Sequence, residues 1–310
     1  MQAPLKLTAF TFVLLTFFLT VTTVHADHVS AAAVGWSNLI VPGLGATLRG
    51  DSTRGLIEST LELGSYYGGT FHAKEGPFTI DGSALVLSDR NVTKPVIGKM
   101  MQQFGLKLHM YNTFYNYREA ALDPSNADHE KLYQQPLYKG TWDETLLAPF
   151  KWKNLKSPWV YVPVLMSTAY LLVDYKNRKP YTTPATTPQE ETLYGISEGV
   201  SFPLGSAFGE EVLFRGFIQR EMRLYTDSII LSIAAETLLF TLIHSPDLRP
   251  SAAAGGVLWG LSVNHFEGDL QPGIASHFWI NFVSGMLNFA QFRKSQGKTP
   301  IGVRLTVPFN

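Results

Sequence analysis

"FGEEVLFRGF", residues 208–217, places three ionisable side chains inside an apolar stretch. Such groups are costly in apolar surroundings unless they are paired. Glu211 and Arg215 are four positions apart, which puts them on the same face of a helix, one turn from each other. We therefore predict that Glu211 pairs with Arg215 and has a supporting role. Glu210 lies about 100° away around the helix, so it is predicted to be free for chemistry.

The composition indicates apolar segments joined by polar ones. Of 310 residues, 45% are apolar and only 16% are charged, against about 25% charged residues in soluble domains. The formal net charge is zero, which gives no indication of a nucleic-acid partner. The chain contains no cysteine, and this excludes disulfides, thiolate metal sites and a cysteine nucleophile.

The first 73 residues divide into two parts. Residues 7–24 are apolar and uncharged, and we predict a cleaved signal peptide at 1–26, with a first transmembrane helix as the alternative. Residues 27–73 contain two apolar, glycine-rich runs and are predicted to form a helical hairpin in or on the membrane. Within it, Glu58 and Glu62 share one helical face, which is interpreted as a solvated or interfacial surface.

Residues 74–157 are more polar, and we predict that most of this segment lies outside the bilayer. It begins with a turn-rich sequence that contains a short β-like run at 83–87. From 96 to 122, apolar residues recur at helical spacing, with Lys107 off the apolar stripe. This pattern predicts an amphipathic helix that lies on the membrane or packs on the membrane domain.

The second half of the chain is predicted to be an all-α, polytopic membrane domain from 158 to 292, followed by a tail at 293–310. No segment alternates with period two as a barrel strand would, so helices are the expected spanning elements. Apolar spans are expected at 157–173, 193–209, 228–244, 251–266 and 270–292.

Two further short motifs, each with a histidine, bring polar side chains into these apolar segments. Phe240 precedes His244 by four positions, and His277 precedes Asn281 by the same interval. Ionisable residues in membrane helices are rare and usually functional. Three helices each present a polar group, so we predict that these groups converge in one cavity. Glu236 lies in the middle of an apolar helix and has no predicted partner.

"EEVLFR", "FTLIH" and "HFWIN" together resemble the three motifs of the CAAX protease and bacteriocin-processing family, also called the Abi family. Order and spacing agree over residues 193–292, whereas 27–157 shows no such likeness. The resemblance implies a protease that hydrolyses peptide bonds inside the membrane.

The resemblance also implies roles for the motif residues. A glutamate and a histidine would hold and activate a water, because water needs a base at neutral pH. A second histidine and an asparagine would stabilise the oxyanion, and a Glu–Arg pair would hold the first-motif helix. The residues implied to hold and activate the water are Glu210 and His277. Those implied to stabilise the oxyanion are His244 and Asn281, and the pair implied to hold the helix is Glu211 and Arg215.

A metal-assisted reaction is left open by the sequence. Glu210, His244 and His277 form a set that also suits zinc, with water as the fourth ligand. Members of the family are often labelled metallopeptidases, although a metal-free glutamate mechanism has been proposed for those that act on prenylated proteins. The residue types fit both interpretations.

Two other functions remain as alternatives to a protease. One is a non-catalytic membrane scaffold or bacteriocin-immunity protein with the same fold. The other is a transporter, which would favour inverted repeats, and the sequence shows none. The expected partners are membrane lipid and a protein or peptide substrate, and the expected location is the bacterial inner membrane.

Overall fold

The computed structural model describes residues 29–74, 78–81, 84–87, 93–125, 136–177 and 186–298, and these are almost entirely helical. The exception within these ranges is an antiparallel hairpin of β1 (Phe78–Asp81) and β2 (Ala84–Leu87). The all-α prediction is therefore confirmed, and the β-like run corresponds to β2. The signal peptide predicted at 1–26 lies outside the described residues.

Helical elements account for most of the described residues. In chain order they are α2 (Ala31–Ile40), α3 (Leu44–Leu48), α4 (Ser52–Lys74), α5 (Thr93–Leu122), α7 (Trp142–Leu146), η2 (Ala148–Phe150), α8 (Trp152–Leu155), α9 (Pro158–Asn177), α10 (Pro188–Ile196), η3 (Ser197–Ser201), α11 (Phe202–Glu211), η4 (Val212–Gln219), α12 (Arg220–Thr226), α13 (Ile229–Leu242), α14 (Arg249–His265) and α15 (Gln271–Ser295).

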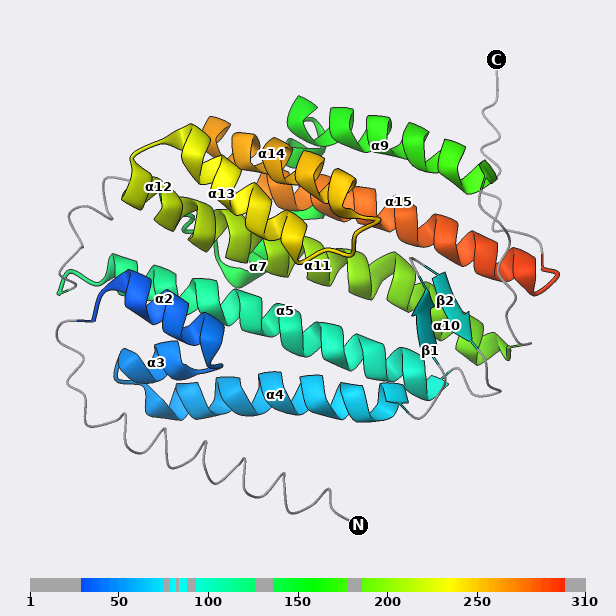
Figure 1. Ribbon diagram of the computed structural model, residues 1–310, viewed down its shortest axis with the longest axis horizontal. Helices are drawn as coiled ribbons and strands as arrows, with labels where there is room; N and C mark the ends of the chain where they lie inside the picture. The colour runs from blue at the N-terminus through cyan, green and yellow to red at the C-terminus, as the bar shows by residue number, and fades with distance from the viewer. Residues whose placement is uncertain are drawn as a thin grey trace, which may run out of the picture.

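The long helices lie side by side in successive rows (Figure 1). At one edge, α4 packs along α5, and α2 packs on α5 as well. The next row contains α11, which contacts α5 on one side and α15 on the other. The α13–α14 pair and α15 follow, and α9 covers α15 at the opposite edge. The motif helix α11 is thus enclosed between an N-terminal and a C-terminal group of helices.

The chain from α10 to α12 runs as one continuous helical rod, but two parts of it are π-helical. The first is η3, and the second is η4, which begins directly after Glu211. Widened turns of this kind are rare and are frequently found at functional sites. Here the change of helix type falls in the middle of the "EEVLFR" motif.

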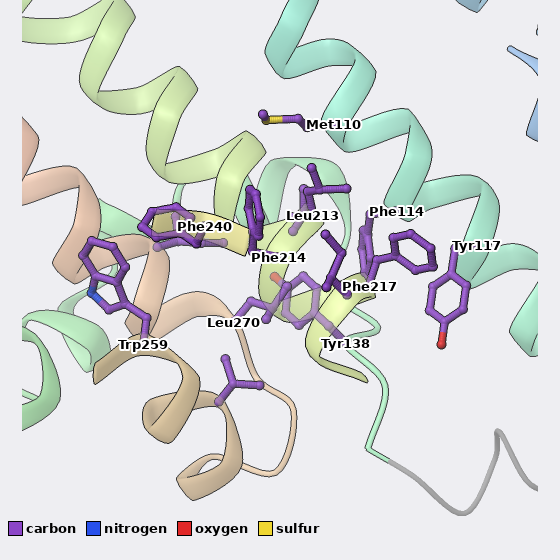
Figure 2. Close-up of a cluster of buried hydrophobic side chains, with 14 of the residues drawn as sticks. Met110, Phe114, Tyr117, Tyr138, Leu213, Phe214, Phe217, Phe240, Trp259 and Leu270 are labelled. Carbon is purple, nitrogen blue, oxygen red and sulfur yellow. The ribbon is translucent and has the colours of Figure 1, made fainter. Parts of the chain in front are cut away.

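The largest apolar core surrounds η4 (Figure 2). Phe214 packs edge-on against Phe240 of α13, with ring centroids 5.1 Å apart. Phe217 packs on Tyr117 of α5 at 4.7 Å. Each of these rings is buried, and aromatic side chains of this size dominate core energetics. The packing of these buried rings of η4 therefore helps to fix the position of the charged residues of the motif.

The expected membrane spans are corrected by the helix bounds. Across the described ranges, no helix is both long enough and apolar enough to cross a membrane. The region expected at 228–244 is a helix of 14 residues, α13, and the region expected at 251–266 is α14, with 17 residues. The region expected at 193–209 is divided among α10, η3 and α11.

The amphipathic helix predicted from residue 96 to 122 is present as α5, but the polar side of the pattern is not wholly exposed to solvent. Lys107, expected off the apolar stripe, is only 7% exposed. Ile97 and Phe104, expected on the stripe, are 40% and 59% exposed. The reason is that α5 is covered on more than one side, by α2 and α4 and by α11, so a single apolar stripe cannot describe its contacts.

Candidate active site

The two motif glutamates form the last turn of α11, and both are buried. Pro203 lies where the π-helical η3 passes into α11. Glu211 is completely inaccessible and Glu210 is 7% exposed. Because carboxylates are rarely buried without compensation, the contacts of each one identify its role.

Glu211 pairs with Arg215 as predicted from their spacing. Nη1 of Arg215 lies 3.2 Å from Oε1 of Glu211, and neither side chain is accessible. Nη2 of the same guanidinium lies 3.2 Å from Oε1 of Glu236 on α13. The guanidinium lies over the rings of Phe240 and Trp259, at 4.4 and 5.3 Å from their centroids. Glu236, which had no partner in the sequence, is therefore part of this buried cluster.

His277 of α15 lies against both motif glutamates. Its Nδ1 is 2.8 Å from Oε1 of Glu211, and its Nε2 is 3.8 Å from Oε2 of Glu210. The ring stacks on Trp259 with centroids 4.0 Å apart. If Nδ1–H donates to the Glu211 carboxylate, Nε2 faces Glu210; a carboxylate on one ring nitrogen fixes the tautomer in this way. The first and third motifs are thus brought together.

Glu210 is not free, and this corrects the sequence prediction. Nζ of Lys107, from α5, forms a buried ion pair with Oε1 of Glu210. Lys107 comes from the segment predicted to lie mostly outside the bilayer, and it is 103 positions away from Glu210. A helical stripe could not reveal it, because the stripe assigned Lys107 to the polar face.

His244 lies just after α13, at the rim of the same cluster. Its Nδ1 is 2.7 Å from the carbonyl oxygen of Phe240, which leaves Nε2 for another partner. Its ring packs on that of Phe240 with centroids 4.6 Å apart, and the Phe240 ring in turn lies edge-on to that of His277, at 6.3 Å. The second motif therefore reaches the site from α13.

Asn281 lies one turn after His277 on α15 and is partly buried. Within the described residues, no hydrogen bond or ion pair connects its side chain to the other motif residues. The direct contacts therefore join Glu210, Glu211, Arg215 and His277, whereas Asn281 is placed near them only by its position on α15.

The charges of this cluster do not balance with every carboxyl group ionised. Glu210, Glu211 and Glu236 are three acids, and Lys107 and Arg215 are two permanent cations. A buried excess charge is costly. The arrangement therefore favours one further proton within the cluster.

The residues expected to hold zinc do not fit that role in this arrangement. Among the described residues, no three His, Cys, Asp or Glu side chains are placed to hold a metal ion. Nδ1 of each histidine is bound to an oxygen, which suits a metal ligand. However, the ammonium of Lys107 contacts Glu210, so a cation already lies beside the one carboxylate of the set.

Part of the chain matches a known protein family. Residues 193–283 match the family model described as type II CAAX prenyl endopeptidase, Rce1-like. No curated protein and no solved structure matches the chain. The matched region contains all three motifs, including His244, His277 and Asn281, and it excludes α2 to α9 and with them Lys107. The resemblance of the three motifs to the CAAX protease family is therefore confirmed over residues 193–283, the part of the chain that is similar to this endopeptidase family.

Proposed function

We propose that this chain is an endopeptidase that hydrolyses a peptide bond in a protein or peptide substrate, with Glu210 as the general base. The observation that carries the proposal is the gap between Glu210 and His277. Oε2 of Glu210 and Nε2 of His277 face each other at 3.8 Å, while the other ends of the two groups are held by Lys107 and Glu211. The two free atoms are where a reacting water would be held.

The proposed reaction needs no group beyond these side chains. Glu210 accepts a proton from the water, and the water oxygen attacks the carbonyl carbon of the scissile bond. Asn281 donates a hydrogen bond from its carboxamide to the oxyanion that forms, and His244 donates from Nε2 in its imidazolium form, because Nδ1–H is already directed at the Phe240 carbonyl. A donor of this kind is worth about 3–4 kcal/mol. The proton on Glu210 then passes to the leaving amine nitrogen. His277 holds the attacking water and stabilises the negative charge that develops during the reaction. Metal assistance stays a separate hypothesis, and no step above depends on it.

Lipid is the proposed environment of the apolar surfaces. Large hydrophobic side chains are exposed along α9, α13 and α4, and contiguous exposed apolar surface of this kind marks an interaction site. They include Val162, Leu165, Met166, Tyr170, Val173, Ile230, Leu231, Leu238, Leu242, Ile57, Leu61 and Phe71. The bacterial inner membrane is the proposed location. A protein or peptide that reaches the site from the membrane is the proposed substrate.

One observation favours the second candidate function, a non-catalytic scaffold. The Lys107 ammonium contacts the carboxylate that a protease would use as its base. A scaffold could retain such an ion pair for stability alone. The two functions differ in one measurable property, because only the protease loses an activity when Glu210 is neutralised.

The test is hydrolysis by purified protein in lipid nanodiscs. A fluorogenic peptide library and a farnesylated CAAX peptide serve as substrates, the latter suggested by the name of the matched family. Glu210→Gln keeps the shape of the side chain but removes the base, and general-base catalysis contributes roughly 10²–10⁴-fold. Glu267→Gln, an exposed glutamate on the α14–α15 turn, is the matched control. Equal cleavage by wild type and Glu210→Gln would exclude Glu210 as the base.

A further inference from the structure

The face of α11 that meets α5 carries two glycines one turn apart, Gly205 and Gly209. A Cβ atom at Gly209 would lie 3.0 Å from both Cβ and Cδ of Lys107, and one at Gly205 would lie 3.4 Å from its Cγ. The aliphatic part of Lys107 therefore lies directly across the two glycines. Small residues at this spacing let two helices approach closely, and here they make room for one particular side chain.

The two glycines lie next to the candidate general base. Glu210 follows Gly209, and the ammonium of Lys107 pairs with its Oε1. Both side chains are 9% exposed, so the ion pair is shielded from water. Lys107 occupies one oxygen of the carboxylate and leaves Oε2 toward His277, at 3.8 Å.

The opposite side of α5 is fixed as well. His109 lies two positions after Lys107, about 200° around the helix, and it contacts the N-terminal helices. Its Nδ1 is 2.7 Å from Oε2 of Glu62, and its Nε2 is 3.1 Å from the carbonyl oxygen of Leu39. A Cβ at Gly105 would lie 2.6 Å from the carbonyl oxygen of Glu62. Helix α5 is thus held closely between α4 and α11, and the position of Lys107 follows from both contacts.

We propose that Lys107 is a positioning residue of the active site, which compensates the charge of Glu210 through Oε1 and directs Oε2 toward His277. The proposal rests on the proposed function of Glu210. It adds a residue from outside 193–283, so the N-terminal helices become part of the catalytic apparatus of this chain rather than a separate appendage.

The absence of cysteine from the whole chain allows a direct test of the ammonium. Lys107→Cys introduces a single thiol. Its reaction with 2-bromoethylamine forms a carbon–sulfur bond, releases bromide and yields a side chain with the length and charge of lysine. Reaction with iodoacetamide fills similar space without the charge. Lys153→Cys, at an exposed lysine on α8, is the control for the chemistry, and mass spectrometry measures the extent of each modification.

Peptide hydrolysis and thermal unfolding are measured for each form in nanodiscs. We expect Lys107→Cys to lower kcat by about tenfold or more, as misplacement of a reacting group does, with little change in KM. Aminoethylation should restore most of kcat, and carbamidomethylation should not. Lys153→Cys should hydrolyse the substrate at the wild-type rate before and after either reaction.

The other outcomes are separable. Normal hydrolysis by Lys107→Cys, with Glu210→Gln inactive, overturns the role of Lys107 and leaves the proposed function intact. Activity in Glu210→Gln instead overturns the proposed function. Equal recovery with both reagents shows that space, not charge, matters, and also overturns the role.

A stability comparison covers the case in which Lys107→Cys does not fold. The double variant Lys107→Met with Glu210→Gln removes both charges and should unfold at a higher temperature than Lys107→Met alone. A double variant that is no more stable than the single one contradicts the pairing.

Discussion

Oε1 of Glu211 and Nδ1 of His277 lie 2.8 Å apart, although the two residues are 66 positions apart in the sequence. The same oxygen is 3.2 Å from Nη1 of Arg215. One carboxylate oxygen therefore connects the Glu-Glu-Arg motif to the histidine of the third motif. Glu211 holds the imidazole in place, and this leaves its neighbour Glu210 to face the open nitrogen of the ring.

Glu211→Gln is expected to destabilise the protein. It leaves Arg215 without one of its buried partners, and removal of one member of a buried ion pair costs roughly 3–5 kcal/mol. Glu210→Gln should affect activity far more than the fold. The free energy of unfolding of each variant, measured with denaturant, separates the two effects. If Glu211→Gln is fully stable yet inactive, the roles assigned to the two glutamates are exchanged.

Glu236→Gln is expected to be tolerated. The cluster has three carboxyl groups and two permanent cations, so a neutral residue at 236 relieves the excess of acid. We expect a change in the free energy of unfolding of about 1 kcal/mol or less, the net value of an ordinary hydrogen bond.

Arg215→Met provides the comparison, because it leaves Glu211 and Glu236 buried without their shared cation and should cost roughly 3–5 kcal/mol. Combining it with Glu236→Gln should recover part of that loss in thermal unfolding. Equal destabilisation by Glu236→Gln and Arg215→Met would show that Glu236 is required as an anion.

Gly209→Ala is expected to reduce activity without loss of the helix. The added Cβ would lie 3.0 Å from Lys107 and displace the ammonium from Glu210. Alanine favours a helix over glycine by about 1 kcal/mol, so α11 itself should persist. Gly64→Ala in α4 is the matched control, since among the described residues no atom outside the adjoining helix backbone lies within 4 Å of its added Cβ. Hydrolysis and circular dichroism measured side by side distinguish the two variants, and unchanged hydrolysis in Gly209→Ala would mean that this contact has no effect on the site.

The stability of the N-terminal helices is expected to depend on pH through His109. Both ring nitrogens face acceptors, Glu62 and the Leu39 carbonyl, and only the imidazolium donates from both. Burial opposes the charge, but the hydrogen bond and charge of Glu62 outweigh it and raise the pKa of His109.

A raised folded-state pKa gives stability that is complete below the unfolded value, about 6.5, and is lost as the pH rises through the folded-state pKa. Thermal unfolding from pH 6 upward should therefore show a decline that His109→Gln removes. His265→Gln, at an exposed histidine, should keep the decline. A wild-type protein whose stability does not fall over this range would contradict a charged His109.

Metal chelation is expected to leave hydrolysis unchanged. The ammonium of Lys107 lies beside Glu210, the carboxylate that a zinc ion would need. Activity is measured after incubation with 1,10-phenanthroline and with its non-chelating 1,7 isomer as control. Selective loss with the chelator, restored by added zinc, would establish metal assistance and require Lys107 to move.

Local spacing in the sequence determined the motif helix and the pairing within it. Glu211 and Arg215 meet because an interval of four residues places two side chains on one helical face, whatever surrounds the helix. The same kind of spacing predicted α5 as a helix but not what the helix packs against. The three motifs, in their order and spacing, also identified the family from residues alone.

The tertiary structure decided which buried charges meet across helices. Spacing carries no information about partners 66 or 103 positions away, so the contacts of His277 with Glu211 and of Lys107 with Glu210 could not be predicted. Glu58 and Glu62 illustrate the same limit: interpreted as a solvated or interfacial face, they are buried against Asn116, His109 and Asn112 of α5. A helical pattern predicts that a polar residue is exposed, because burial of such a residue is costly unless it has a polar partner. That partner comes from another helix, distant in the chain, and only the packing of the helices shows which one it is.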